Sequence, residues 1–327
     1  MINFNEKPLK DMTFIDLFAG MGGFHIALES LGAECVYANE WDKHAQDTYE
    51  QNFNIRPDGD ITLVNEGDIP DHDILCAGFP CQAFSISGNK QGFEDSRGTL
   101  FFDVARIVKY SRPKVVFLEN VKNFASHDEG RTLQVVKSTM EGLGYSFYSQ
   151  VLSATDYGIP TKRERIYMVC FRGDVDSSLF SFPKPFELVK HIEDFILTEA
   201  EDIPQEVPLS DVTITKEDSK YSSSPIRLGH VNEGRQGERI YSTKGAAITF
   251  SAYGGGKFAR TGGYLIDGKV RKLHPRECAR LMGYPDSHQL AKSTSQAYKQ
   301  LGNSVVVDVL QHIGLSIAKT LHAENKD

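Results

Sequence analysis

The stretch TFIDLFAGMGG, residues 13–23, decides the fold of this chain. An apolar run predicts a strand over 13–18, the glycine-rich residues 20–23 follow, and a helix is expected over 24–31. Glycine lets the backbone turn tightly and approach a ligand closely, and a helix N-terminus favours a negatively charged group. A strand, a glycine loop and a helix in this order are typical of a cofactor-binding α/β domain.

The glycine loop does not carry the complete dinucleotide fingerprint. Counting on from Gly20 and Gly22, the third glycine of that pattern falls at His25. Glu40 ends the next predicted strand, where an acid holds a ribose diol in such folds, and the single tryptophan, Trp41, follows it as a candidate for stacking on an adenine. A tight turn with an exposed acid, and a tryptophan that merely packs, remain open alternatives.

Further strands and helices alternate over the first half of the chain. Strands are predicted over 34–39, 73–78, 114–118 and 165–171, and a helix over 99–110. The nearly continuous apolar run at 114–118 indicates a strand covered on both faces. The pattern predicts an α/β fold with a mostly parallel sheet.

The second half of the chain differs in composition and charge. Nine acids and one lysine occupy 193–218, whereas eleven Lys or Arg and four Asp or Glu occupy 225–280, in a protein of net charge −8. One basic block in an acidic protein predicts a localised polyanion site. The expected division is 1–190 for a catalytic and cofactor-binding domain, 191–274 for a small β-rich domain, 275–302 for a connection, and 303–327 for a C-terminal helix returning to the first domain.

The five cysteines are an odd number and form no Cys-x-x-Cys pair, which argues against disulfides and against a metal site. Four of them lie in predicted strands or helices and are expected in the core: Cys35, Cys76, Cys170 and Cys278. Cys81 instead follows Pro80 in a Gly- and Ser-rich stretch after a strand has ended. An unperturbed thiol is only a few per cent thiolate at pH 7, so a reactive Cys81 requires activation.

Three further polar residues flank predicted strands. Glu119 ends the most apolar strand, and because the carboxyl ends of parallel strands meet at one edge, we expect Glu119 and Cys81 to face one crevice, with Glu119 as a proton donor. Arg163 and Arg165 precede the apolar residues 166–171 of the last of these strands, and alternate residues point the same way, so both can face that crevice. A structural acid and an exposed basic rim are the alternatives.

Taken in order, these motifs resemble the cytosine-C5 DNA methyltransferases over essentially the whole chain. The motifs are Phe18-x-Gly20-x-Gly22, Pro80-Cys81-Gln82, Glu119-Asn120-Val121, Arg163-x-Arg165, Arg276-Glu277-Cys278-Ala279-Arg280 and Gly302-Asn303-Ser304-Val305. One departure is Thr161, where the family usually carries Gln. The resemblance implies a Rossmann-like methyltransferase domain that depends on S-adenosylmethionine, with a smaller β-rich target-recognition domain.

The resemblance also implies the site residues. Catalysis is expected from Cys81, which adds to carbon 6 of a flipped cytosine, from Glu119, which protonates ring N3, and from Arg163 and Arg165 beside the base's O2 and a phosphate. S-adenosylmethionine, with S-adenosylhomocysteine as product, is expected at Phe18, Gly20, Gly23, Glu40, Trp41, Asp60, Ile61, Pro80, Leu100, Asn303 and Val305. Double-stranded DNA is expected at Ser85, Ser87, Gln236, Arg239, Tyr253, Gly255 and Gly256.

The likeness of 234–243 and 251–256 to a family member that modifies GCGC implies the inner cytosine of 5′-GCGC-3′ as the target. It also implies the modification half of a restriction-modification system. An RNA cytosine-C5 methyltransferase, a nicotinamide-dependent oxidoreductase and a DNA-binding repressor without catalysis are the competing interpretations. The chain has no run of 18 apolar residues and no signal-like start, so we expect a cytoplasmic monomer without a membrane or an obligate protein partner.

Overall fold

The structure is a computed structural model that describes residues 6–80, 100–198, 202–218 and 220–323 of the chain. The chain forms two compact units and passes between them more than once. The first unit comprises 1–152, 164–183 and 310–327, and the second comprises 153–163 and 184–309. Residues 275–302, for which the sequence predicts a connection, fall within the second unit.

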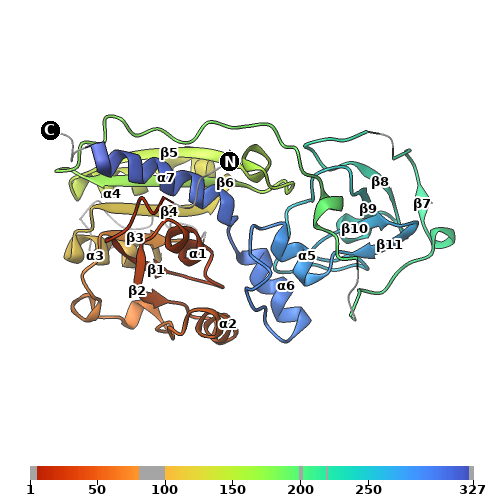
Figure 1. The fold of residues 1–327 in the computed structure, drawn as a ribbon, viewed down its shortest axis with the longest axis horizontal. Coiled ribbons are helices and arrows are strands. Elements are labelled where there is room, and N and C mark those ends of the chain that lie inside the picture. Colours follow the sequence, from red (N-terminus) through yellow and green to blue (C-terminus); the bar gives the residue numbers. More distant parts are fainter. Residues whose placement is uncertain (1–5, 81–99, 199–201, 219, 324–327) are drawn as a thin grey trace. The chain divides into compact units, whose positions relative to one another are not determined.

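The first unit is built on a six-stranded sheet of order β2-β1-β3-β4-β6-β5 (Figure 1). Its strands are β1 (Thr13–Leu17), β2 (Glu34–Asn39), β3 (Ile74–Ala77), β4 (Val115–Val121), β5 (Tyr145–Ser153) and β6 (Glu164–Arg172). The neighbouring pairs among the first four strands are parallel, and β6 runs antiparallel to β4. The predicted α/β fold is confirmed, with a mixed sheet that is parallel over these four strands.

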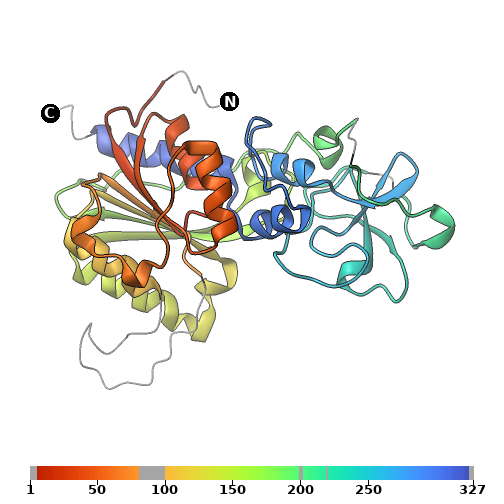
Figure 2. The same cartoon turned by 90° about the horizontal axis from the view of Figure 1, so that it is seen from below.

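Helices cover both faces of this sheet. They are α1 (Gly23–Ser30), α2 (Lys43–Phe53), α3 (Leu100–Ser111), α4 (Arg131–Gly142) and the last helix α7 (Val307–Ala323). Figure 2 shows α3 and α4 on one face and α1 and α7 on the other. The alternation of β1 follows from this: Ile15 and Leu17 join the core beneath α3, whereas Phe14 packs edge-on against His25 of α1.

The second unit contains a five-stranded sheet of order β11-β10-β9-β8-β7. Its strands are β7 (Thr213–Ile214), β8 (Arg227–His230), β9 (Arg239–Ser242), β10 (Gly263–Ile266) and β11 (Lys269–Lys272), and its helices are α5 (Pro275–Arg280) and α6 (Thr294–Asn303). Val207, Leu228, Val231, Ile240, Phe258 and Val270 form its core. A separate core accounts for the folding of this unit around its own short strands.

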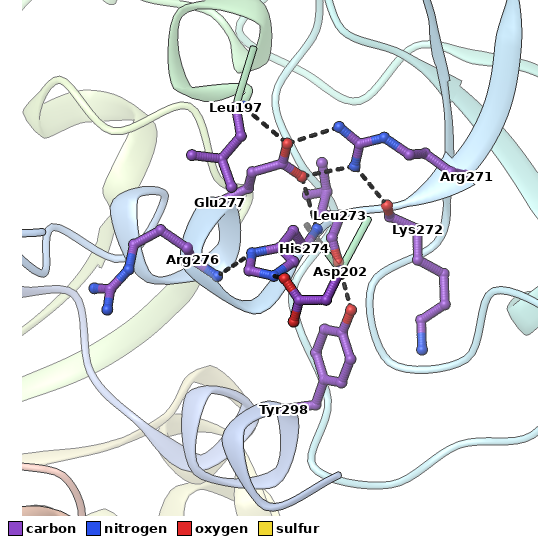
Figure 3. A network of polar contacts seen from close by, with 9 residues as sticks. All are labelled: Leu197, Asp202, Arg271, Lys272, Leu273, His274, Arg276, Glu277 and Tyr298. Atoms are coloured by element: carbon purple, nitrogen blue, oxygen red, sulfur yellow. Dashed lines mark hydrogen bonds and ion pairs between the residues drawn. The ribbon is translucent and has the colours of Figure 1, made fainter. Parts of the chain in front are cut away.

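A buried ion pair joins β11 to α5 in the second unit (Figure 3). Arg271 donates to both carboxylate oxygens of Glu277, at 2.8 and 2.7 Å, and both residues are buried. The same carboxylate accepts the backbone N–H groups of His274 (2.7 Å) and Leu197 (3.0 Å). Every contact satisfies a charge that would otherwise be costly to bury, so Glu277 joins β11, the start of α5 and the sequence-distant segment at Leu197.

His274 caps the N-terminus of α5 from its side chain. Its Nδ1 accepts the backbone N–H of Arg276 at 3.1 Å, and its Nε2 lies 3.0 Å from a carboxylate oxygen of Asp202. Because Nδ1 accepts, the proton of a neutral ring sits on Nε2 and is donated to Asp202. The helix start is thus tied both to Glu277 and to the acidic segment.

One helical stretch, Thr294–Ala323, is long and apolar enough, by length and composition, to cross a membrane. It consists of α6 and α7 separated by the non-helical residues 304–306, and 67% of its most apolar window is buried inside the protein. Within the first unit, Ile313 and Ile317 of α7 are fully buried, and Gly314 packs against Leu28 and Leu31. Packing against the sheet side of α1 accounts for the apolar composition of α7.

The C-terminal helix that the sequence predicts from residue 303 begins later, and this prediction is wrong. Gly302 and Asn303 are the last residues of α6, and α7 begins only at Val307. Gly302 is required by a close approach instead: a Cβ there would lie 2.3 Å from the backbone nitrogen of Ala252. A long-range backbone contact of this kind leaves no periodic signal in the sequence.

We expect Glu277→Gln to lower the free energy of unfolding of the second unit by about 3–5 kcal/mol, because Arg271 keeps a buried charge without its counterion. Glu206→Gln is the matched control, since Glu206 pairs with Lys269 at 2.6 Å between exposed side chains, and its loss should cost less than about 1 kcal/mol. Denaturant unfolding of the two variants measures the difference. Equal losses would contradict a structural role for the buried pair.

Asp308, in the first turn of α7, predicts a pH dependence of stability. Burial raises its pKa to about 6, with Lys190 partly opposing the shift. The folded pKa lies above the unfolded one, so ionising Asp308 costs folding free energy: the cost is absent below pH about 4 and reaches about 3 kcal/mol by pH 7. Asp308→Asn should therefore stabilise the protein at pH 7 and hardly at pH 4 in denaturant titrations, unlike the exposed control Asp267→Asn.

Candidate functional site

The ends of β3 and β4 are tied together at one edge of the first unit's sheet. The Asn120 side-chain amide donates to the Phe79 carbonyl at 2.9 Å, and its oxygen accepts the Val121 N–H at 2.9 Å. A Cβ on Gly78 would lie only 3.6 Å from Oε2 of Glu119. The Glu119 carboxyl therefore lies beside the segment that leads through Pro80 to residue 81.

Glu119 is paired with Arg165 from the adjacent strand. Nε of Arg165 lies 3.0 Å from Oε1 of Glu119, and the two side chains are 13% and 10% exposed. Arg165 stands opposite Val121, so the pair is a diagonal contact across the antiparallel β4–β6 ladder. A guanidinium at this distance stabilises the charged carboxylate in a site with little water.

Arg163 has different surroundings, all in the second unit. Its guanidinium is buried and donates to the backbone carbonyls of Phe250 (3.4 Å), Gly302 (3.2 Å) and Ser304. These bonds hold the end of α6 against the segment that begins at Phe250. Arg163 thus connects two backbone segments through hydrogen bonds. Its expected role beside the base stays a prediction.

Thr161, the departure from the family pattern, is fully buried in the second unit. Its hydroxyl donates to the Leu281 carbonyl at 2.7 Å, and residue 161 bridges Ala247 through the backbone. Its polar atom is used within the fold, which argues for a structural contribution from this position.

The glycine loop of the first unit is organised by one carboxylate. Glu40 accepts the Gly20 N–H through Oε2 and the Asp42 N–H through Oε1, both at 2.8 Å. Burial raises the pKa of Glu40, and these backbone donors oppose that rise. A Cβ on Gly20 would meet nothing within 4 Å, whereas one on Gly22 would lie 2.2 Å from the Phe53 ring. The loop is packed on its Gly22 side and open on its Gly20 side.

The other expected cofactor residues of the first unit surround this loop in sequence and at strand ends. Phe18 follows β1 with a left-handed φ of 56°, and Gly23 begins α1. The Trp41 ring is 70% exposed at the end of β2, and Asp60 caps the short helix of Ile61 by accepting the Thr62 N–H at 3.0 Å. Pro80 is exposed after β3, and Leu100 begins α3.

Asn303 and Val305, the remaining expected cofactor residues, belong to the second unit. Asn303 is exposed at the end of α6, and Val305 is buried just beyond it. Three expected residues, Cys81, Ser85 and Ser87, lie outside the residues that the structure describes.

Asp16 is a buried acid just before the glycine loop, and the sequence predicts no role for it. It is fully buried on β1, and neither carboxylate oxygen has a hydrogen-bond partner. Burial raises its pKa well above the usual range, and the charge of Glu40 adds to this. An acid within an otherwise apolar strand directly before the glycine loop was the available signal.

The expected DNA-reading residues gather in two loops of the second unit. Gln236 is exposed in a short 3-10 helix, and Arg239 begins β9 opposite His230, with its Nε buried and without a hydrogen-bond partner. Tyr253 is exposed in the second loop, together with Gly255 and Gly256. The two loops meet backbone to backbone, because a Cβ on Gly237 would lie 1.9 Å from the Gly255 carbonyl oxygen.

The four described cysteines are confirmed as parts of the fold. Cys76, Cys170 and Cys278 are buried, Cys35 is half-buried, and burial raises the pKa of every one of these thiols, that of Cys35 to about 12. None of these four is poised to form a thiolate. Over the described part of the chain, no group of three His, Cys, Asp or Glu side chains is arranged to hold a metal ion.

Comparison with known proteins defines the class to which this fold and site belong. The family model of C-5 cytosine-specific DNA methylases matches residues 12–319, so the chain belongs to that family. It is 64% identical over 323 residues to the type II methyltransferase M.HhaI of Haemophilus parahaemolyticus, covering 98% of this chain and 99% of that protein. It is 41% identical to M.HpaII of Haemophilus parainfluenzae, over 97% of this chain and 92% of the relative.

Solved structures bear out the fold. The S. pombe Dnmt2 methyltransferase matches with a TM-score of 0.71 at 22% identity, over 97% of this chain and 100% of that one. The predicted family and the α/β methyltransferase fold are confirmed together.

Asn120→Asp tests the bond that ties β3 to β4. The carboxylate cannot donate to the Phe79 carbonyl and places two acceptors face to face, so we expect the first unit to lose about 1–3 kcal/mol of unfolding free energy. Asn65→Asp is the matched control, because Asn65 only accepts the Gly67 N–H, at 3.2 Å, and aspartate accepts equally well. Thermal unfolding distinguishes the two, and an unchanged Asn120→Asp protein would contradict the assignment.

Proposed function

We propose that the protein transfers a methyl group from S-adenosylmethionine to carbon 5 of a cytosine in double-stranded DNA, at the inner cytosine of 5′-GCGC-3′. The observation that carries this proposal is the pairing of Glu119 with Arg165 beside the strand end that leads to Cys81. The motif order is that of the family to which the chain belongs. The first unit supplies the chemistry, and the second reads the DNA.

Cys81 is the proposed nucleophile, since burial keeps the described thiols protonated. Carbon 5 of cytosine is a weak nucleophile on its own. A thiolate at residue 81 adds to carbon 6, which directs the ring electrons towards N3 and makes carbon 5 nucleophilic. S-adenosylmethionine, when bound, would supply an electrophilic methyl group to carbon 5 and leave as S-adenosylhomocysteine. Loss of the carbon 5 proton to solvent water, return of the N3 proton to Glu119 and departure of the Cys81 thiolate restore the aromatic ring.

Glu119 controls the proton at N3 in this scheme. Transfer of a proton from its carboxyl to N3 neutralises the electrons that thiolate addition pushes there. Arg165, already 3.0 Å away, stabilises the carboxylate that remains, and we assign its Nη2 to the base's O2, since its Nη1 donates to the Glu164 carbonyl at 2.8 Å. Arg163 acts by holding the segments at Phe250 and Gly302 in register.

The carboxylate at the glycine loop fits a cationic cofactor. Glu40 lies at this loop, and the Gly20 N–H, which would cradle a pyrophosphate in a dinucleotide site, is already bonded to it. A sulfonium and an ammonium are favoured by such surroundings, whereas a pyrophosphate is repelled. The exposed Trp41 is assigned to stack on the adenine. The fit supports S-adenosylmethionine over a nicotinamide dinucleotide.

The target follows from the reading loops. Arg239 is assigned to a guanine, a bidentate contact worth about 1–3 kcal/mol of discrimination. Gln236 and Ser87 are assigned to the space that the flipped cytosine leaves, with Ser85, Tyr253, Gly255 and Gly256 contacting the DNA around it. The relatives are named type II methyltransferases, which supports a role in restriction-modification for this chain. We infer that it acts as a cytoplasmic monomer.

Bisulfite sequencing of plasmid DNA from cells that express the protein tests the proposal. We expect methylated inner cytosines at GCGC sites with the wild type, and none with Cys81→Ser, because the hydroxyl is far less acidic than the thiol. Retained binding of a GCGC duplex by the serine variant is the control for folding. Methylation at other sequences would change only the target, whereas efficient methylation by Cys81→Ser would remove the covalent mechanism.

A further inference from the structure

Two loops of the second unit touch through their backbones at glycines. They are the first loop, 231–239, and the second loop, 250–258. A Cβ on Gly237 would lie 1.9 Å from the Gly255 carbonyl oxygen, and one on Gly256 would lie 2.8 Å from the Gly237 carbonyl oxygen. Real Cβ atoms essentially never come within 3.0 Å of another heavy atom. The obstructing atoms are main-chain, so the loops must move apart before any side chain fits at 237.

The contact lies within a set of hydrogen bonds that fix the first loop. The Val231 N–H donates to the Glu238 carbonyl at 2.9 Å and closes the base of the loop. The Glu238 carboxylate accepts the Arg235 N–H at 3.0 Å and the Asn232 amide at 3.3 Å. The backbone of the first loop at Gly237 is therefore held in place where it contacts the second loop.

The second loop is held at both of its ends. Arg163 donates to the Phe250 carbonyl at its start, and the Phe258 N–H donates to the Gly237 carbonyl, at 2.7 Å, at its end. The Phe258 side chain is buried in the core of the unit. Residues 253–257 between these anchors are exposed. The Gly237 backbone thus joins both loops to one another and, through Phe258, to the core.

We propose that Gly237 is a positioning residue for target recognition: its contact with the Gly255 backbone sets the spacing between the two DNA-reading loops. The inference rests on the proposed function, which assigns base contacts to these loops. Relief of a 1.9 Å contact to the 3.0 Å limit requires a displacement of about 1 Å. Hydrogen bonds to base edges do not tolerate that shift, whereas phosphate contacts carry no sequence information and are less affected.

Gly237→Ala tests the proposal, with Gly254→Ala as the matched control. A Cβ on Gly254 makes only ordinary contacts, 3.4 Å from the Arg260 nitrogen and 3.7 Å from the Ala259 Cβ. Affinity is measured for a GCGC duplex and for one with a changed outer base pair. We expect the ratio of the two affinities, GCGC over changed duplex, to be at least tenfold smaller in Gly237→Ala than in the wild type. The variant should also raise KM for DNA more than it lowers kcat. Affinities for non-target DNA and for S-adenosylmethionine should be unchanged, and Gly254→Ala should keep the ratio.

Gly256→Ala approaches the same contact from the other loop and decides the matter if Gly237→Ala fails to fold. It should reduce the ratio in the same way and speed hydrogen exchange at the Phe258 N–H. A folded Gly237→Ala or Gly256→Ala protein that keeps the wild-type ratio overturns the inference and leaves the proposed function standing. A wild-type protein without preference among the duplexes contradicts the proposed target, and the inference falls with it.

Discussion

The hydrogen bond from the Asn120 amide to the Phe79 carbonyl joins the two strand ends on which the proposed chemistry depends. Parallel strands bring their carboxyl ends to one edge, but only to within a strand spacing of each other. Asn120 sets the remaining distance between the two strand ends. Its amide donates to the Phe79 carbonyl just after β3, and its oxygen accepts the N–H of the next residue on β4. Glu119, one residue earlier, is thereby held beside Gly78 and the chain that continues to Cys81.

Much of the first unit could be predicted because its signals are local. The strand expected over 34–39 coincides with β2, and the helix expected over 99–110 is α3 shifted by one residue, since both rest on apolar periodicity. The direction of β6 could not be predicted: an apolar run has the same pattern in parallel and antiparallel strands, yet its antiparallel course is what places Arg165 diagonally opposite Glu119.

The roles of Arg163 and Gly302 were out of reach of the sequence for a related reason. Alternation along an extended segment predicts that Arg163 and Arg165 point the same way, but it does not reveal which partners each meets. Arg165 finds a carboxylate in the first unit, and Arg163 finds three carbonyls, more than 80 residues away in sequence, in the second. Contacts between backbone groups that are distant along the chain leave no composition or spacing by which to detect them.

The distribution of charged residues between the two units distinguishes their tasks more clearly than the net charge of the protein does. In the first unit the Glu40 carboxylate occupies the Gly20 N–H of an open glycine loop, so this donor is not available to a phosphate. The second unit carries the basic block of 225–280, in which the buried charges on Arg271 and Glu277 neutralise each other. Because this buried pair is neutral overall, it adds little electrostatic potential at the surface. The exposed arginines and lysines of the block therefore remain available to a polyanion. For the proposed function, which requires a cationic cofactor and an anionic duplex at the same time, keeping these fields on separate units is an advantage.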